Sequence, residues 1–122
     1  MNFYYYKAQG VRVIDGDIIV CDIDLGFNTW LKDEHVRLYG IDTPEVRTKD
    51  LDEKRRGYEA KDYLDGLIAD NFGEVILETF FDGSGKYGRT LANVYVTDSD
   101  GEKLISLNEC LLEKGLAEVY IK

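Results

Sequence analysis

The sequence predicts an α+β protein, a five-stranded β-barrel with one long and one short helix. Three observations support this prediction: two pairs of β-rich segments, an amphipathic segment between the pairs, and a short capped helix near the end. The chain has 122 residues, 44% of them hydrophobic, which is enough to bury one core. We therefore expect residues 1–122 to form a single domain.

The first half of the chain is expected to be sheet. Residues 4–14 and 17–25 are rich in aromatic and β-branched side chains, which favour strands. Asp15-Gly16 between them is a hairpin-turn dipeptide. A third strand is expected at residues 35–39, after a turn at residues 26–28.

A long helix is expected to follow this sheet. Five apolar side chains recur at the spacing of one helix face: Ala60, Tyr63, Leu64, Leu67 and Ile68. The preceding residues 46–56 are highly charged and lack this periodicity, so they are expected to form an exposed loop.

The remaining residues predict a second hairpin and a short helix. Residues 75–81 and 91–96 are strand-like, and residues 82–85 form a glycine-rich turn between them. Residues 106–109, Ser-Leu-Asn-Glu, have the capping-box pattern, and Lys114-Gly115 is typical of a helix end. Residues 98–102 are expected to be a polar hairpin turn.

Composition limits the function classes. A net charge of -9 argues against a protein held on nucleic acid by a broad basic face. It leaves room for a site built from local arginines and a divalent cation, which changes the field at a carboxylate cluster. No apolar run is long enough for a membrane span, so no membrane partner is expected, and Cys21 and Cys110 fit no metal or redox spacing.

The first residues lack the pattern of a secretory leader. The expectation for localisation is therefore a cytoplasmic protein, or a secreted one whose leader has been removed. We also expect a monomer.

Residues 36–45, Val-Arg-Leu-Tyr-Gly-Ile-Asp-Thr-Pro-Glu, carry the strongest functional signal. Asp42 offers a hard oxygen ligand, and Asp17, just past the hairpin turn, would converge with it if their strands are neighbours. The backbone carbonyl of Thr43 would add another ligand, and such oxygen ligands suit Ca²⁺. Arg37 has a planar fork of donors that matches a phosphate. Pro44 fixes the backbone before Glu45, which would orient or deprotonate a water.

Further candidates lie in the last third of the chain. Arg89 would be a second arginine stabilising charge on a phosphoryl group. Lys86 and Tyr87 would meet a terminal phosphate, and Tyr120 would stack on a base.

Each candidate also has a structural explanation. Arg37 would form an ion pair with Asp42, Glu45 would be an exposed acid in a turn, and Arg89 a solvated cation at a strand end. For Asp15 we favour the structural explanation, a turn aspartate that accepts a hydrogen bond from its own backbone.

Three motifs in order give the chain a resemblance to the staphylococcal nuclease family: residues 15–17 (Asp-Gly-Asp), residues 37–45 (Arg-Leu-Tyr-Gly-Ile-Asp-Thr-Pro-Glu) and residues 86–89 (Lys-Tyr-Gly-Arg). The resemblance implies an OB-fold barrel and a calcium-dependent nuclease that cuts DNA, preferably single-stranded, and RNA with little sequence specificity, leaving 3′-phosphates. It implies the roles given above: Ca²⁺ at Asp17, Asp42 and Thr43, catalysis by Arg37, Glu45 and Arg89, and phosphate contacts from Lys86 and Tyr87.

The chain departs from the family pattern at Ile18, where threonine is common after Asp-Gly-Asp, which removes a hydroxyl from the outer shell of the metal. The alternative function is a non-catalytic module of the same fold that binds nucleic acid or protein. The net charge and Ile18 favour this alternative slightly, and the full set of five catalytic and metal-binding side chains opposes it.

Overall fold

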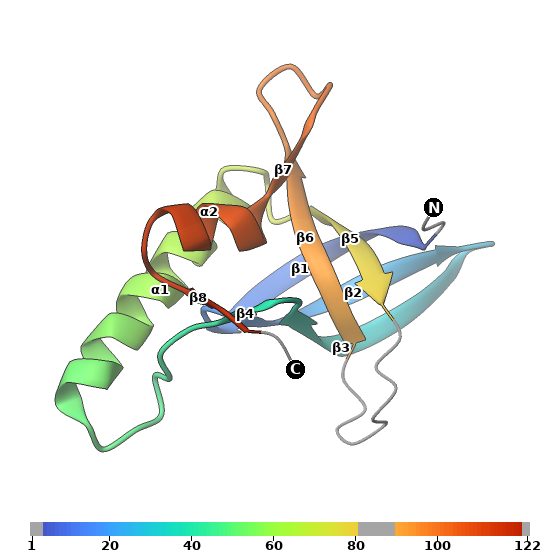
Figure 1. Cartoon of the computed structure of the whole chain (residues 1–122). Helices are drawn as coiled ribbons and strands as arrows, with labels where there is room; N and C mark the ends of the chain where they lie inside the picture. The colour runs from blue at the N-terminus through green and yellow to red at the C-terminus, as the bar shows by residue number, and fades with distance from the viewer. Residues whose placement is uncertain (1–3, 81–89, 121–122) are drawn as a thin grey trace.

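The computed structural model describes residues 4–80 and 90–120, which form a closed barrel with two helices beside it (Figure 1). The barrel strands are β1 (Tyr5–Asp15), β2 (Ile18–Gly26), β3 (Thr29–Leu38), β5 (Val75–Phe80) and β6 (Thr90–Thr97). Their order is β3-β2-β1-β5-β6, and β3 pairs in parallel with β6 to close the ring. The predicted five-stranded α+β barrel is confirmed.

The helices and short strands complete the fold. Helix α1 (Leu51–Ala69) is the long helix and α2 (Leu107–Glu113) the short one. Strand β7 (Leu104–Ser106) pairs with β6, and this hairpin projects from the barrel in Figure 1. Strands β4 (Ile41–Asp42) and β8 (Glu118–Val119) form a separate two-stranded sheet between the barrel and the helices (Figure 1).

Alternation of side chains builds the barrel. In β3, Val36 and Leu38 are fully buried while Arg37 between them is only partly so. In β6, Ala92 and Val94 are likewise buried, because successive side chains of a strand point to opposite faces. The strands therefore present one set of residues to the core and the other set to an outer surface.

Helix α1 covers one end of the barrel with the face that the sequence predicted. Ala60 and Leu64 are fully buried, and Ile68 nearly so. Tyr63 and Leu67 pack against the same core while remaining partly exposed.

The prediction of an exposed loop over residues 46–56 is wrong for its second half, because α1 begins at Leu51. The Asp50 side chain caps the helix by accepting hydrogen bonds from the backbone N–H groups of Asp52 and Glu53. Arg55 pairs with Asp52 and with Glu59, one turn apart on either side. Such pairs support a helix without apolar periodicity, which is why this turn escaped a search for an apolar face.

Two further differences concern strands. Strand β3 begins at Thr29, six residues earlier than predicted. The β4–β8 pairing joins Ile41 to Val119 and Asp42 to Glu118, and its two-residue strands carry no local sequence signal. Both cysteines are free thiols, with Cys21 buried and Cys110 partly exposed.

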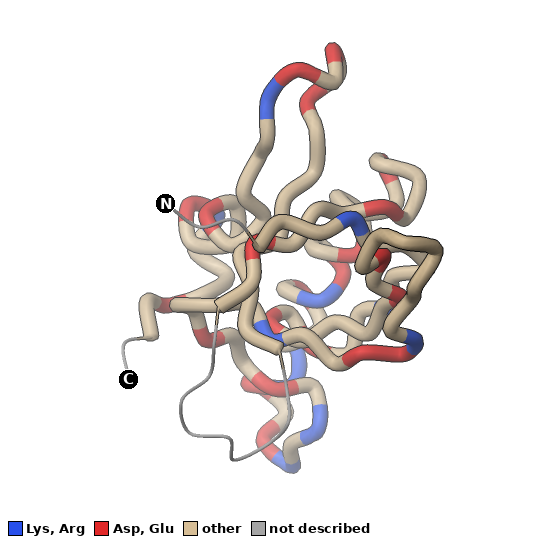
Figure 2. Tube along the Cα trace, turned by 90° about the vertical axis from the view of Figure 1, so that its right-hand side faces the viewer, with Lys and Arg blue, Asp and Glu red and all other residues tan. Residues whose placement is uncertain are grey.

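Charge is dispersed over the described part of the molecule. Figure 2 shows Asp and Glu along the strands, the helix and the hairpin, with Lys and Arg between them. This agrees with the 24 acidic and 15 basic residues of the whole chain. None of the described helices is both long and apolar enough to cross a membrane.

Candidate functional site

Asp17 occupies the turn that joins β1 to β2, and its side chain is almost completely buried, with 4% of the residue exposed. Its Oδ2 atom accepts hydrogen bonds from Arg37 Nη1 at 3.0 Å and from the Thr43 backbone N–H at 3.3 Å. The Asp17 backbone carbonyl also accepts from the Leu38 N–H. The turn is therefore tied to the end of β3 and to the segment after β4.

The environment of Asp17 disfavours its charge. Burial raises the pKa of the Asp17 carboxyl, and the nearby Asp42 and Asp15 carboxylates raise it further. The Arg37 guanidinium and the Thr43 N–H lower that pKa, but burial dominates. The Asp17 carboxyl is therefore protonated more easily than a solvent-exposed aspartate.

Arg37 lies between the two candidate metal carboxylates. Its Nη1 is 3.0 Å from Asp17 Oδ2, and its Nη2 is 3.5 Å from Asp42 Oδ1. Nη2 also donates to the Ile41 backbone carbonyl at 3.2 Å. The side chain is 18% exposed, so part of the guanidinium still faces solvent. The structure contains the ion pair between Arg37 and Asp42 that was the structural explanation for Arg37. Together with the pair to Asp17, it places Arg37, Asp17 and Asp42 in one cluster.

Asp42 and Thr43 come from β4 and the residue after it. Asp42 is exposed, with 58% of its side chain accessible, whereas Thr43 is buried. The Thr43 hydroxyl is buried without a hydrogen-bond partner among the described residues. A Cβ on Gly16 would lie 3.0 Å from that hydroxyl, so the hairpin turn and the Thr43 segment pack closely.

Glu45 is exposed, and its side chain makes no hydrogen bond or ion pair within residues 4–80 and 90–120. Its backbone is held instead: the Glu45 N–H donates to Glu53 Oε2 at 3.3 Å. Glu53 Oε1 accepts from the Thr48 hydroxyl. Behind the loop, Gly57 of α1 packs against the Glu45 carbonyl, where a Cβ would come within 2.6 Å of the oxygen. The first turns of α1 thus fix the loop and leave its carboxylate free.

The sequence does not predict the roles of three residues that hold the site together. Asp15 was assigned a bond to its own turn, but its Oδ1 accepts from the Val46 N–H at 3.3 Å, across 31 residues. Glu53 lay in the expected loop, although an Asp50-x-x-Glu53 spacing is a helix-start signal. Gly57 had no sequence signal beyond being a glycine inside a helix.

Tyr120 lies beside the cluster. The Arg37 guanidinium carbon is 5.5 Å from the centre of the Tyr120 ring, a cation–π contact. The Tyr120 N–H donates to the Gly40 carbonyl at 2.9 Å, which continues the β4–β8 pairing. The other candidates, Lys86, Tyr87 and Arg89, lie outside the described residues.

The donor set fits a hard cation in its chemistry. Two carboxylates and a main-chain carbonyl are oxygen ligands of the kind Ca²⁺ takes, with water and substrate completing six to eight positions. The described residues contain no group of three or more His, Cys, Asp or Glu side chains that could hold a metal ion. Three such oxygen ligands would leave about three to five of the six to eight positions to other ligands.

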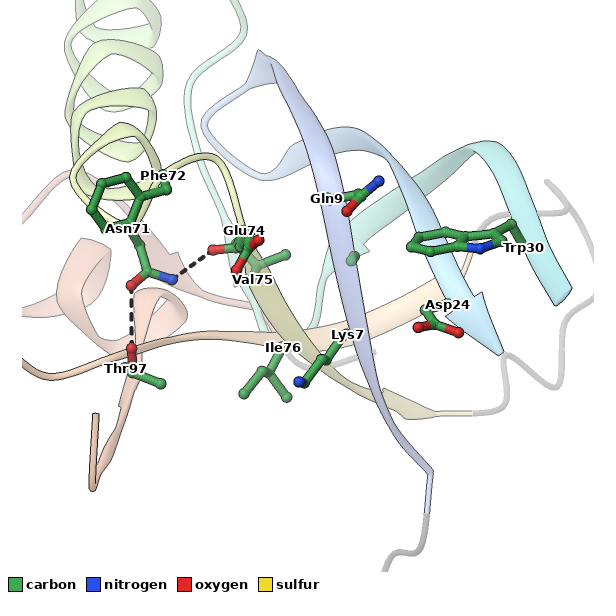
Figure 3. Close-up of a pocket in the computed structure, with 11 residues that line it drawn as sticks. Lys7, Gln9, Asp24, Trp30, Asn71, Phe72, Glu74, Val75, Ile76 and Thr97 are labelled. Carbon is green, nitrogen blue, oxygen red and sulfur yellow. Dashed lines mark hydrogen bonds between the residues drawn. The ribbon is translucent and has the colours of Figure 1, made fainter. Parts of the chain in front are cut away.

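The hollows on the surface of the described residues include the following two. One, of about 230 Å³, is lined by Asp42, Thr43 and Pro44 on one side and by Glu53 and Arg56 of α1 on another. The second, of about 540 Å³, shares no lining residue with the first. Figure 3 shows it, with Phe72 and Trp30 at opposite ends and Lys7 and Gln9 of β1 between them. Only the first lies at the carboxylate cluster.

The closed barrel with two helices beside it is an OB-like α+β fold, and it carries Arg37 between a buried and an exposed carboxylate. The family model described as staphylococcal nuclease homologue matches residues 35–122, and the chain belongs to this family. The resemblance inferred from the three motifs is confirmed.

The chain is similar to three curated relatives, two of which are thermonucleases. The chain is 30% identical over 135 residues to an uncharacterized protein of Methanocaldococcus jannaschii, covering 96% of this chain and 60% of that protein. It is 35% identical over 116 residues to the thermonuclease of Staphylococcus hyicus, covering 95% and 59%, and 36% identical over 106 residues to that of Staphylococcus intermedius, covering 87% and 55%. The chain thus spans somewhat over half the length of each relative.

Proposed function

We propose that this domain is a calcium-dependent nuclease that hydrolyses phosphodiester bonds of DNA, preferably single-stranded, and of RNA, with little sequence specificity, leaving 3′-phosphate ends. The observation that carries the proposal is the single cluster in which Arg37 contacts both Asp17 and Asp42. Two thermonucleases among the relatives support the same reaction class.

Asp17, Asp42 and the Thr43 carbonyl are the proposed calcium ligands. When bound, Ca²⁺ would supply positive charge next to a phosphate oxygen. Within the chain, Arg37 binds the phosphoryl group with the part of its guanidinium that faces solvent, and Arg89 is the proposed second arginine. Because Arg37 is held by Asp17 and the Ile41 carbonyl, its donors are positioned before substrate arrives.

Glu45 is the proposed residue that handles the attacking water. Its carboxylate has no partner among residues 4–80 and 90–120, while its backbone is fixed by Glu53, which suits a group that must accept a proton at a defined position. Water oxygen bonds to phosphorus as the bond to the 5′-oxygen breaks, and the proton removed from water is available for the leaving oxygen. Lys86 and Tyr87 are proposed to contact a terminal phosphate, and Tyr120 a base.

The test measures release of acid-soluble nucleotides from heat-denatured DNA with calcium and then with a chelator. We expect cleavage with calcium and none with the chelator. Arg37→Lys should lower turnover about 10²–10³-fold, the scale of losing one preorganised donor. Arg12→Lys is the matched control, because Arg12 forms an exposed ion pair with Asp33 outside the cluster. Absence of cleavage with every divalent metal would overturn the proposal.

The alternative, a non-catalytic module, predicts a different result. A nucleoside bisphosphate would then raise the melting temperature, since a ligand of the folded state stabilises it, while DNA stayed intact. The net charge of -9 and Ile18 at the start of β2 are the features that favour it.

A further inference from the structure

A pair of aromatic rings lies next to Arg37 on the outer surface of the barrel. The Tyr39 and Phe80 ring centres are 4.7 Å apart with an interplanar angle of 33°. Tyr39 is 49% exposed, so one face of the pair is open to solvent. Other aromatic residues of the chain are as exposed, and the strand pairings that follow distinguish this pair by its place beside Arg37.

The strand register places this pair on the same surface as the arginine. Arg37 of β3 pairs with Leu91 of β6, and Leu91 pairs with Phe80 of β5, so the three side chains form one row across the sheet. Paired residues project from the same face, and adjacent strands are about 4.8 Å apart, which puts Phe80 roughly 10 Å from Arg37. Tyr39 follows Arg37 by two residues and shares its face.

The backbone at Tyr39 is fixed from both sides. Its N–H donates to the Ala92 carbonyl at 2.8 Å, and its carbonyl accepts from the Asn108 side-chain amide at 2.8 Å. Phe80 supports one side of the Tyr39 ring. A ring held in this way loses little freedom when a ligand stacks on it, so most of the stacking energy is available for binding.

We propose that the Tyr39–Phe80 pair is a stacking site for a base of single-stranded nucleic acid, adjacent to the nucleotide whose phosphate meets Arg37. The inference rests on the proposed function for the identity of the ligand. Aromatic faces accept every base, which agrees with little sequence preference. A duplex keeps its bases stacked on one another, so this pair selects single strands.

The acidic charge of the chain favours a contribution to affinity from stacking. At a net charge of -9, neutralisation of phosphates supplies little affinity, because that term requires many Lys and Arg contacts. Stacking does not depend on charge. The Tyr39–Phe80 pair therefore provides affinity that the acidic surface does not.

The first measurement is fluorescence anisotropy of a labelled oligothymidylate with the whole chain in chelator, so that no cleavage occurs. Loss of one stacked base corresponds to about 1–3 kcal/mol, so Tyr39→Ala should raise Kd about 5–150-fold. Tyr39→Phe keeps the ring and should stay within about twofold of wild type. Trp30→Ala is the control for an exposed aromatic residue, since Trp30 lies on β3 roughly 20 Å from Arg37 at the usual rise per residue.

A second measurement identifies the base. A set of oligonucleotides is used, each with an abasic site at a different position. One of these positions should weaken binding to the wild type, and the same position should have no effect on binding to Tyr39→Ala. If Tyr39→Ala fails to fold, as judged by its melting curve, Phe80→Ala replaces it. Equal Kd values for the wild type and both alanine variants would overturn the inference, and so would no measurable binding by the wild type. It would also be overturned if the abasic position lowered affinity as much in Tyr39→Ala as in the wild type.

Cleavage assays separate this inference from the proposed function. If the wild type cleaves DNA and Tyr39→Ala cleaves it with the same KM, the stacking site is overturned and the proposed function is not. Binding that depends on Tyr39, without cleavage under any metal condition, supports the stacking site and overturns the proposed catalysis.

Discussion

Gly57 is the position where a small change should affect both the stability of the fold and the activity. It lies in α1, buried against the loop that carries Glu45. A Cβ there would lie 2.6 Å from the Glu45 carbonyl oxygen and 2.9 Å from that of Pro44. Because both contacts are backbone atoms, Gly57→Ala must push the loop away by several tenths of an ångström.

Gly66 in the same helix provides the matched comparison, since a Cβ there has no atom within 4 Å. Both substitutions gain the same helix propensity, about 0.5–1 kcal/mol. Only Gly57→Ala also carries the cost of overpacking, about 1–3 kcal/mol. For a chain of this size, 1 kcal/mol shifts the melting temperature by roughly 4 °C. Gly66→Ala should therefore melt about 4–12 °C higher than Gly57→Ala.

The activity assay gives the second half of the prediction. If Glu45 handles the water, displacing its backbone should lower turnover on denatured DNA by roughly 10–100-fold, as expected when a catalytic group moves by up to an ångström. Gly66→Ala should keep wild-type turnover. Equal melting temperatures and equal turnover for the two variants would refute the claim that α1 positions this loop.

Three other predictions test the surroundings of the site. Asp17→Asn in metal-free buffer at neutral pH should melt at or above the wild-type temperature, because burial raises the pKa of Asp17 and makes its charge unfavourable in the fold; a clear decrease would contradict this. Adding calcium should stabilise the wild type and leave Asp17→Asn unchanged. Asn108→Ala should lower the free energy of unfolding by about 2–4 kcal/mol in urea titration, since it leaves buried backbone groups without partners. Burial raises the pKa of the Cys21 thiol to about 12, so at pH 8 an alkylating reagent should modify Cys110 first and reach Cys21 only on unfolding.

The sequence was sufficient for the elements whose signals are local. The aromatic and β-branched residues of segments 4–14 and 17–25, with Asp15-Gly16 between them, predicted β1 and β2 with their turn, and the apolar spacing from Ala60 to Ile68 predicted the buried face of α1. The capping box at Ser106 predicted α2, whose Ser106 hydroxyl accepts from the Glu109 N–H. In each case the chemistry that forms the element lies within a few neighbouring residues.

Elements formed by distant pairing could not be predicted in this way. The β4–β8 pairing joins Ile41 to Val119, and the closure of the barrel joins Val36 to Thr90. Two-residue strands have no periodicity to detect, and a parallel closure depends on the whole barrel. The first turns of α1 were missed for another reason: their stabilisation comes from Asp50 and from charge pairs.

The same distinction between local and distant signals applies to the candidate site. Asp17, Arg37 and Asp42 were identified because their residue types suit a phosphate and a cation, and the structure brings them into contact. The residues that hold them are chemically ordinary, and their roles follow only from tertiary contacts. Asp15 illustrates this, since the same turn aspartate reaches Val46 rather than its own backbone.

Helix α1 connects the separate parts of the site through residues that lack bulk. A Cβ on Gly16, in the turn that carries Asp17, would come within 2.7 Å of the Ala60 Cβ and within 3.0 Å of Thr43. Gly57, three residues before Ala60 on α1, meets the backbone of Glu45 equally closely. One face of α1 therefore contacts both the turn that carries Asp17 and the loop that carries Glu45. A larger side chain at any of these three small residues would move apart the segments that carry Asp17 and Glu45, the groups proposed above to act on one phosphate.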